Sequence, residues 1–365
     1  MKSYFADLQS RNFGLDILRA TAILLVLYSH RSMISTSDSK EAHFIYLCGY
    51  WGVELFFVLS GYLIGWQLIK LSENESRLKS YLHFFKRRWA RTLPLYFLVL
   101  AWYVAYEAVE FPWRHLLFLQ NTKGAQLNDL NLFGQSWSLT IEEFAYIILP
   151  ISFLIGSKLF NFASRNSILI VLMVIIFLSL LARIFYFLTI PEINYDVWIR
   201  KSTFLRLDSI AYGILIAWVR IYAFAYFLRL RGVIFPLISL FTIIICNTVG
   251  DILVMKSENA LFFPSTFGFC LNGILLSMLI PFFDSNDFIS SLRKFRFLFW
   301  GVTTTAIFSY CLYLIHLPFY KFFYIQFDGK IPFKLNVAMM LTVIYVVSFF
   351  SYFLIERPII KWSKK

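Results

Sequence analysis

The sequence predicts an all-α polytopic membrane protein, a bundle of about ten transmembrane helices with both termini in the cytoplasm. The first observation is composition: 59% of the 365 residues are hydrophobic and 15% are charged, whereas soluble domains carry roughly one-quarter charged residues. A water-soluble core cannot absorb that much apolar surface. The second is that apolar runs of about 17 to 25 residues, long enough to cross a bilayer, recur along the whole chain.

Ten candidate spans are separated by short polar stretches. They cover residues 15–33, 45–68, 92–109, 137–155, 168–190, 203–217, 233–249, 261–283, 302–324 and 337–355. An even number of spans places both termini on the same side of the membrane. We see no repeat, linker or additional soluble segment, so we expect a single transmembrane domain over residues 1–365 without an appended extracytoplasmic domain.

Basic residues predict the orientation. The connection over residues 70–91 is rich in Lys and Arg. The other loops and the tail on the same side of the membrane also carry basic residues: Arg220, Arg229, Arg231, Arg293, Lys294, Arg296, Lys364 and Lys365. By the positive-inside rule this side is cytoplasmic. Basic loops on the cytoplasmic side, next to the anionic inner leaflet, then explain the net charge of +13. We therefore expect no nucleic-acid partner.

The four cysteines, Cys48, Cys246, Cys270 and Cys311, are isolated. Their spacing predicts neither a disulfide framework nor a metal site. The first apolar run begins near Leu15 after a polar leader, and no small-residue cleavage site follows it. We therefore expect a retained helix and not a signal peptide.

Arg19 and His30 lie in the first span, and charged residues at membrane depth are candidate functional residues because each costs roughly 2.5 to 3.5 kcal/mol there. Their positions are eleven residues apart, which amounts to about three turns and about 16 Å of helix, so both side chains share one face. This geometry suits an extended anionic ligand that runs across the membrane. A snorkelling arginine and an interfacial histidine explain the pattern equally well.

Glu54 interrupts the apolar segment 52–61, where a carboxylate has no reason to face lipid. We expect it to face the interior and to pair with a cation or an imidazole. Ser60 has a plainer explanation, because Gly61 and Gly65 form a Gly-x-x-x-Gly face on which a small neighbour allows close helix packing. Ser60 is therefore predicted mainly as a packing residue.

The segment 86–91 contains Arg87, Arg88 and Arg91 beside a tryptophan. Guanidinium groups bind phosphates through several hydrogen bonds at once, so the cluster is a candidate phosphate site. Any cytoplasmic loop can also be basic. The cluster alone does not decide between these two interpretations.

Trp137, Ser138 and Glu142 open the fourth span. Acidic residues in a first helical turn often only complement the helix dipole or a cap, so this segment alone is interpreted as structural. Further along, Asp208 either pairs with Arg206 or holds a neighbouring helix. His316 precedes a proline at an expected kink.

Taken together, these segments resemble the acyltransferase-3 family, in the order the family has them. The matching pieces are Leu15-Asp16 through Arg19 to His30 (the family's Arg-x10-His), the segments 52–61, 87–94 and 137–142, Arg206-Leu-Asp208 with Gly213, the segment 309–316 with Tyr313 and His316, and Glu356-Arg-Pro358. Two positions depart from the family pattern: Glu54 stands where Asp is usual, and Cys311 where Ser or a similar small residue is usual. Some relatives append a hydrolase-like extracytoplasmic domain, which we do not expect here.

The resemblance implies a membrane-bound O-acyltransferase of the bacterial cytoplasmic (inner) membrane. Such an enzyme moves an acyl group, most often acetyl, from cytoplasmic acyl-CoA to a sugar hydroxyl. The acceptor would be an envelope or secreted glycan or glycolipid, as in lipopolysaccharide or exopolysaccharide biosynthesis. Acyl-CoA is then a co-substrate, and the resemblance implies no permanently bound cofactor and no metal. It leaves the oligomeric state open.

The residues identified above take roles in such a reaction. The phosphates of CoA would be held by Arg19, Arg87, Arg88 and Arg91. His30 would take the proton from the attacking hydroxyl, and Glu54 would fix the His30 tautomer and stabilise the imidazolium. A covalent acyl-histidine intermediate remains an alternative. Candidates for stabilising the oxyanion are Ser60, Ser138, Tyr313 and His316.

A transporter or flippase of an acylated or anionic lipid or glycan is the alternative class of protein, because it also places Arg, Glu and His inside a helical bundle. Such folds commonly show internal repeats and broken helices, and the sequence shows no half-to-half symmetry. A non-enzymatic scaffold or sensor would not need a buried Arg-x10-His stripe. Binding of CoA distinguishes the acyltransferase from the transporter.

Overall fold

The computed structural model describes residues 11–31, 39–72, 77–107, 112–122, 132–159, 164–190, 195–254, 262–327 and 329–363. Within these residues the chain is helical and has no β-strand, as the sequence predicted. The α-helices are α2 Phe13–His30, α3 Ser39–Ser72, α4 Arg77–Glu107, α5 Trp113–Leu116, α7 Ser136–Leu159, α8 Ser164–Thr189, α9 Leu207–Tyr222, α10 Phe224–Arg229, α11 Ile234–Val254, α12 Phe262–Ser265, α13 Phe267–Ser277, α14 Leu279–Ser285, α15 Asp287–Ser291, α16 Arg296–Phe327, α17 Phe333–Ser351 and α18 Arg357–Ser363. Two π-helices, η2 Tyr195–Arg200 and η6 Tyr352–Glu356, and two 3₁₀ turns, η3 Phe204–Arg206 and η5 Leu292–Lys294, join them.

Seven stretches of the described chain are long and apolar enough to cross a membrane: Phe13–His30, Phe44–Leu71, Ser136–Gly156, Arg165–Thr189, Phe267–Ser285, Arg296–Phe327 and Phe333–Ser363. Helices also cover the other three predicted spans, but α4, α9 and α11 do not meet that description, so the count of ten is not confirmed. For α9 the reason is length, since its 16 residues reach about 24 Å, less than the hydrocarbon core of about 30 Å. The predicted span ends at residues 33, 109 and 261, and the basic residues Lys364 and Lys365, lie outside the described residues.

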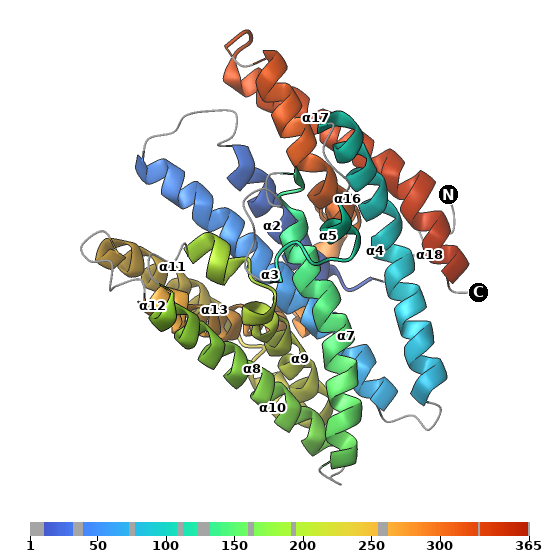
Figure 1. Cartoon of the computed structure of the whole chain (residues 1–365), viewed down its shortest axis with the longest axis vertical. Helices are drawn as coiled ribbons and strands as arrows, with labels where there is room; N and C mark the ends of the chain where they lie inside the picture. Colours follow the sequence, from blue (N-terminus) through green and yellow to red (C-terminus); the bar gives the residue numbers. More distant parts are fainter. Residues whose placement is uncertain are drawn as a thin grey trace.

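Helix α3 is the centre of the bundle and packs against α2 and α9 (Figure 1). Glycines allow the close approach. A Cβ on Gly61 would overlap the carbonyl of Ile210, and a Cβ on Gly213 of α9 would overlap the carbonyl of Val58. Gly65 meets Ile214 of α9 in the same way. The predicted close packing at Gly61 and Gly65 is therefore confirmed, with α9 as the partner helix.

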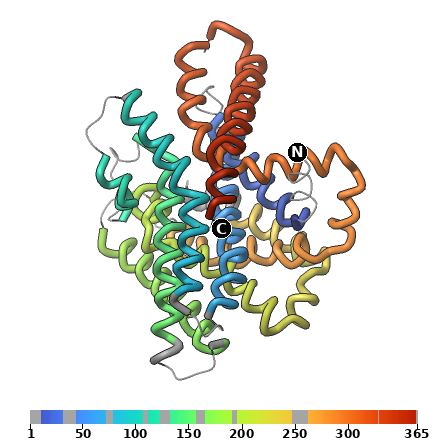
Figure 2. The backbone as a smooth tube through the Cα atoms, turned by 90° about the vertical axis from the view of Figure 1, so that its right-hand side faces the viewer, coloured from blue at the N-terminus to red at the C-terminus, as the bar shows by residue number. Residues whose placement is uncertain are grey.

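Helix α16 lies beside α2. The rings of Phe13 and Phe299 are 5.5 Å apart at one end, and the Tyr320 hydroxyl donates to the Leu27 carbonyl at 2.6 Å near the other. The end of α16 and the start of α17 form a hairpin that projects from the rest of the molecule, and α18 follows at the other end (Figure 2). Helices α2 and α16, which lie far apart in the chain, are thereby brought together.

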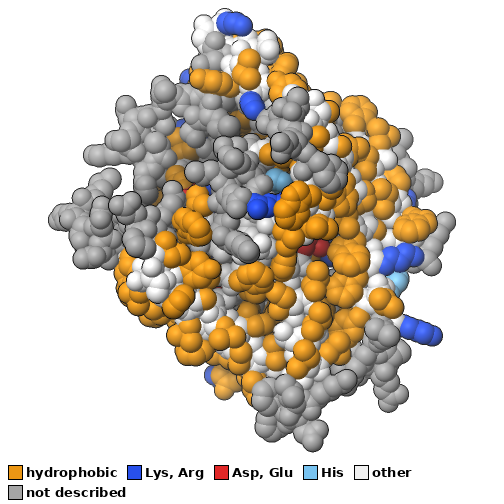
Figure 3. Space-filling model, in the orientation of Figure 1, with side chains coloured by type: hydrophobic (Ala, Val, Ile, Leu, Met, Phe, Trp, Pro, Cys, Tyr) orange, Lys and Arg blue, Asp and Glu red, His pale blue; other side chains and the backbone are white. Residues whose placement is uncertain are grey.

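The outer helices expose apolar side chains. In the predicted membrane spans, 78% of the α3 stretch is buried but only 28% of the α8 stretch, so α3 is an inner helix and α8 a peripheral one. Hydrophobic side chains cover much of the face seen in Figure 3. Such a surface is typical of a helix bundle that faces lipid.

The two ends of the described chain lie on one side of the bundle, because Arg11 and Lys361 line the same cavity. This agrees with the prediction that both termini share one side. That this side is the cytoplasmic one stays a prediction.

Candidate active site

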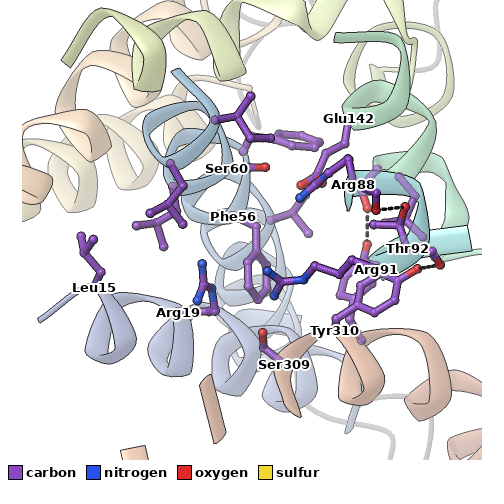
Figure 4. A pocket seen from close by; sticks show the side chains of 18 of the residues that line it. Leu15, Arg19, Phe56, Ser60, Arg88, Arg91, Thr92, Glu142, Ser309 and Tyr310 are labelled. Atoms are coloured by element: carbon purple, nitrogen blue, oxygen red, sulfur yellow. Dashed lines mark hydrogen bonds and ion pairs between the residues drawn. The ribbon is translucent and has the colours of Figure 1, made fainter. Parts of the chain in front are cut away.

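A central cavity lies among α2, α3, α4, α7 and α16 and holds about 1390 Å³ of empty space, counting its open mouth. Arg19 enters it from α2, and Arg88 and Arg91 enter from α4 (Figure 4). Phe56 and Leu63 of α3 give it an apolar wall. A few charged groups on an apolar wall are the usual form of a small-molecule site.

A second, more basic cavity adjoins the central one and shares Arg88 and Arg91 with it. Six basic side chains line the second cavity, and we call them the basic mouth: Arg11, Arg87, Arg88, Arg91, Arg357 and Lys361. Three of them lie on α4 and two on α18, and Arg11 directly precedes Asn12, the N-cap of α2. The predicted cluster of Arg87, Arg88 and Arg91 is thus joined by cations from both ends of the chain.

Arg88 is held in place by α7. Its Nη2 donates to Glu142 Oε2 at 2.9 Å and also to the Tyr146 hydroxyl, and its guanidinium carbon lies 3.9 Å from the centre of the Tyr146 ring. The Tyr146 hydroxyl in turn donates to Glu142 Oε2 at 2.6 Å and contacts Ser60 Oγ. Burial lowers the pKa of Arg88, but Tyr146 and Glu142 raise it above its ordinary value. Ser60 and Glu142, which the sequence indicated separately, therefore belong to one network around Arg88.

Arg19 and Arg91 have looser ion pairs. Arg91 Nε lies 3.7 Å from Glu356 Oε1, and Arg19 Nη1 lies 3.8 Å from Asp16 Oδ1. Both distances exceed those of good hydrogen bonds. Figure 4 shows the two side chains pointing into the same space from opposite sides. Both guanidinium groups can therefore turn toward an anion in the cavity.

His30, at the end of α2, meets His316 of α16. Nε2 of His316 lies 3.3 Å from Nδ1 of His30, and the ring centres are 4.8 Å apart. Each Nδ1 also faces a backbone carbonyl of its own helix, Val26 at 2.9 Å for His30 and Tyr313 at 2.7 Å for His316. A carbonyl only accepts hydrogen bonds, so Nδ1 carries the proton in both neutral rings. Nε2 of His316 is then an acceptor toward His30.

This assignment leaves Nε2 of His30 with a lone pair, and within the described residues no hydrogen bond reaches that atom. His316 is fully buried, whereas His30 is partly exposed. A neutral imidazole with an accessible lone pair is suited to general-base catalysis. The sequence indicated each histidine but not their contact, because 286 residues separate them.

Glu54 is fully buried and faces a cation, as its position in an apolar segment suggests. Arg206 Nη2 donates to Glu54 Oε1 at 2.5 Å, and Ser209 Oγ donates to Oε2 at 3.2 Å. Both carboxylate oxygens are thus occupied at the contact of α3 with α9, and the described structure has no hydrogen bond between Glu54 and His30. The position beside His30 Nδ1, which we expected Glu54 to fill, is occupied by His316.

Ser138 and Tyr313 connect the central cavity to the histidine pair. Both line the cavity, and Ser138 Oγ lies 2.6 Å from the Tyr313 hydroxyl. The Tyr313 ring centre is 5.8 Å from that of His316. Trp137 is buried but does not line the cavity; its ring lies 5.1 Å from the Arg200 guanidinium carbon. The segment that opens α7 therefore contacts the cavity through Ser138 and another polar cluster through Trp137.

Asp208 holds a neighbouring helix and lines neither cavity. Arg183 of α8 donates to Asp208 Oδ2 at 2.7 Å, and both side chains are fully buried. Arg206, the other partner considered from the sequence, bonds Glu54 instead. Among the residues that line either cavity, Asp208 does not appear.

Two residues of the site, Tyr146 and Glu356, were not predicted from the sequence as site residues. Tyr146 follows Glu142 by one helical turn, a spacing that places both on one helix face and could have indicated it. Glu356 was part of a matched segment, but nothing in the sequence indicated its contacts with Arg91 and with the Cys311 thiol, which donates to Glu356 Oε2 at 3.3 Å. In the part of the chain that the structure describes, no group of three or more His, Cys, Asp or Glu residues could hold a metal ion.

The sequence matches a known protein family over most of its length. The family model described as an acyltransferase domain (acyltransferase-3) matches residues 12–357. The chain belongs to the acyltransferase-3 family. The resemblance inferred from the seven sequence segments is thereby confirmed, and the apolar helices together with the family make this acyltransferase an integral membrane protein.

A curated relative gives a narrower indication. This acyltransferase is 30% identical over 188 residues to the protein of Bacillus subtilis (strain 168) named "Putative peptidoglycan O-acetyltransferase YrhL". The match covers 44% of this chain and 27% of the length of YrhL. No solved structure is significantly similar to this acyltransferase.

Proposed function

We propose that this acyltransferase moves an acetyl group from cytoplasmic acetyl-CoA to a hydroxyl of an envelope or secreted glycan, in the inner membrane of a bacterium. The proposal is supported by three features that adjoin one another: the basic mouth, the central cavity and the histidine pair. A basic mouth opens into a cavity whose far wall, at Tyr313, adjoins a histidine pair with one free lone pair. An acyl-CoA has phosphates at one end and a reactive thioester at the other. The phosphates would bind the arginines and lysine of the basic mouth, and the thioester would then lie toward His30, the general base.

The basic mouth would bind the phosphates. Arg87 and Arg91 lie on α4, and Arg357 and Lys361 on α18, so the two helices provide cations from two directions. Guanidinium groups form bidentate hydrogen bonds with phosphate oxygens. Arg19 would bind deeper in the central cavity, where the apolar wall of α3 would contact the pantetheine arm.

The histidine pair would perform the chemistry. The acceptor hydroxyl gives its proton to His30 Nε2 while its oxygen attacks the thioester carbon. The new C–O ester bond forms, the C–S bond breaks, and the CoA thiolate recovers the proton from His30. During this step His30 is an imidazolium, and its Nδ1 proton is shared by the Val26 carbonyl and His316 Nε2. General-base catalysis of this kind contributes about 10²- to 10⁴-fold in rate.

The Tyr313 hydroxyl and Ser138 Oγ would bind the developing oxyanion. They lie 2.6 Å apart at the cavity wall, and both donate to the Gln135 carbonyl, Tyr313 at 3.1 Å and Ser138 at 3.4 Å. One of the two hydroxyls would therefore turn from that carbonyl to the oxyanion during the reaction. We favour this pair over Ser60, which contacts Tyr146, because the Tyr313 ring lies 5.8 Å from that of His316.

The test uses purified protein in nanodiscs with acetyl-CoA, and the ester-linked acyl groups of the native cell's glycans. His30→Gln should leave the acetyl-CoA affinity within about twofold and remove the acyl ester, because it takes away the base and not the phosphate contacts. His83→Gln is the matched control, since His83 is an exposed histidine on α4. If deletion of the gene removes an ester that His30→Gln retains, the mechanism is wrong. If acetyl-CoA does not bind and no glycan changes, the transporter alternative replaces the proposal.

Acetyl-CoA with a labelled acetyl group separates direct transfer from an acyl-histidine intermediate. Direct transfer predicts no protein-bound label in the absence of acceptor. Label bound to the wild-type protein, absent from His30→Gln and released by hydroxylamine, would show the intermediate instead.

A further inference from the structure

A second polar cluster lies beyond the end of the central cavity that is farthest from the basic mouth. The second cavity reaches Gln67 of α3, and the central cavity extends along α3 from Gln67 to Val53. Further along the same helix, the rings of Tyr50 and Tyr46 lie 5.8 Å and 5.4 Å from the Arg200 guanidinium carbon. The basic mouth therefore lies near Gln67, toward the C-terminal end of α3, and η2, which carries Arg200, packs against the N-terminal part of α3 at Tyr46 and Tyr50.

We call this group the η2 cluster: Asp196, Arg200 and Lys201. Arg200 Nη1 donates to Asp196 Oδ1 at 2.6 Å, and Lys201 Nζ pairs with Asp196 Oδ2. Burial raises the pKa of Asp196, but Arg200 and Lys201 together hold it below its ordinary value, so the carboxylate is ionised. Among the described residues of this cluster, one negative charge thus faces two positive charges. In addition, Arg200 Nε is buried and has no hydrogen-bond partner within the described structure.

The η2 cluster is fixed in position beside the reaction centre. Asn121 Nδ2 donates to the carbonyls of Trp137 at 3.0 Å and of Lys201 at 2.6 Å, which ties η2 to the start of α7. The Trp137 ring lies 5.1 Å from Arg200, while the next residue, Ser138, lines the central cavity. The η2 cluster and the central cavity therefore meet at the start of α7, the cluster at Trp137 and the cavity at Ser138.

We infer that the η2 cluster is the acceptor subsite and that the acceptor is an anionic glycan, with a carboxylate or phosphate near the hydroxyl that is acylated. This inference rests on the proposed function. An excess cation with an unpartnered Nε is suited to an anion, and the Tyr46 ring, 38% exposed, offers a face to a sugar. A neutral glycan would leave the excess charge of Arg200 and Lys201 without a partner.

The first experiment can be done before the acceptor is identified. Glycans from cells with and without the gene are separated by anion exchange, and ester-linked acyl groups are measured in each fraction. The ester should disappear from the acidic fraction. Its loss from a neutral fraction would overturn the inference while leaving the proposed function intact, and loss from no fraction would overturn the proposed function itself. Carbodiimide reduction removes carboxylates and phosphatase removes phosphates, so the treatment that makes the acylated glycan neutral identifies the anion.

The second experiment tests the residues. Arg200→Gln should lower transfer to the acidic glycan at least tenfold, mainly through KM, with the acetyl-CoA affinity unchanged, and Arg200→Lys should restore part of the activity. Transfer to the same glycan after its anion has been removed should be equal in the wild type and in Arg200→Gln. Arg229→Gln is the control, because Arg229 also stacks on an aromatic ring, 5.4 Å from Tyr226, but on α10, after the other end of α9. An equal loss on charged and neutral acceptors would assign Arg200 to the histidine pair instead. Lys201→Gln repeats the test at a more exposed position if Arg200→Gln does not fold.

Discussion

His30 donates through Nδ1 to a carbonyl and to a second histidine, where many catalytic histidines donate to a carboxylate. The difference suits its location. A carboxylate at membrane depth needs a compensating cation, since an ionised side chain there costs roughly 2.5 to 3.5 kcal/mol. His316, fully buried, supplies an acceptor without adding a charge. The pair is thus neutral before the reaction and carries one positive charge only while His30 holds the proton.

The variant His316→Phe should lower the transfer rate by roughly 10- to 100-fold, the worth of a hydrogen bond to a charged group. Phenylalanine retains a ring in the buried site but accepts no hydrogen bond from His30. The acetyl-CoA affinity, measured in nanodiscs, should stay within about twofold. Tyr320→Phe is a useful comparison, because it removes a hydrogen bond to the Leu27 carbonyl close to the pair, and its transfer rate should fall much less. Equal losses in both variants would contradict the assigned role of His316.

Sequence reasoning identified the individual polar residues better than their partners. Arg19, Arg88 and Arg91 do line one cavity. The expected partner of His30 was Glu54, whereas His316 lies beside His30 in the structure. His316 is 286 residues away, and a single sequence holds no record of which helices touch. Glu54 had a cation as one of its two expected partners, and Arg206 of η3 is that cation.

At the scale of elements, α4 carries most of the predicted phosphate site. Arg87 and Arg91 are one turn apart on one face of the helix and line the same basic cavity with Arg357. The π-helix η6 ends at Glu356, whose carboxylate meets Arg91, immediately before α18 begins. An inserted π turn shifts the residues that follow it around the helix axis. In this chain it brings the start of α18 to α4.

The charge-removing pair Arg87→Gln with Arg91→Gln should weaken acetyl-CoA binding by about tenfold or more, since each loses a charge-assisted hydrogen bond. S-acetylpantetheine, which has the thioester but no phosphate, should bind the wild type and the variant equally. Arg229→Gln, which removes a cation outside both cavities, should affect neither ligand. A loss of S-acetylpantetheine binding in the double variant would mean that these arginines shape the cavity instead of binding phosphate.

The contact of α3 with α9 gives a test of stability. Gly61→Ala should destabilise the protein by several kcal/mol, because the new Cβ would overlap the Ile210 backbone carbonyl and neither helix can shift without moving the other. The midpoint of thermal unfolding in detergent is the readout. Gly301→Ala on α16 is the matched control, since nothing lies within 4 Å of its Cβ position, and alanine there should be neutral or slightly stabilising. An unchanged midpoint for Gly61→Ala would show that the two helices are not in contact.

For the molecule as a whole, the two candidate sites lie at opposite ends of α3. The basic mouth contains Lys361 and shares one side with the chain ends, whereas η2 lies at the other end of the same helix. If the positive-inside rule applies, donor and acceptor enter from different compartments and meet at the histidine pair.

The number of spans does not follow from apolar length alone, because inner helices such as α9 contact protein more than lipid.

Cysteine labelling tests this orientation. Lys361→Cys should react with a membrane-impermeant maleimide in inside-out vesicles and not in intact spheroplasts. Trp198→Cys on η2, where the tryptophan is 37% exposed, should show the opposite pattern. Four native cysteines are present, so the wild-type protein provides the background. Labelling of both variants from the same side would contradict the two-sided path.

Helix α9 also bears on how the protein is made. It is 16 residues long, and within the described structure the charges at its start pair with helices synthesised earlier: Arg206 with Glu54 of α3, and Asp208 with Arg183 of α8. Until α9 leaves the ribosome, Glu54 and Arg183 lack these two partners. The segment has little tendency to partition into lipid by itself, because it is short and begins with two ions. Its entry is therefore an assembly step, in which a site between α3 and α8 is filled, and the earlier helices must remain close together until then.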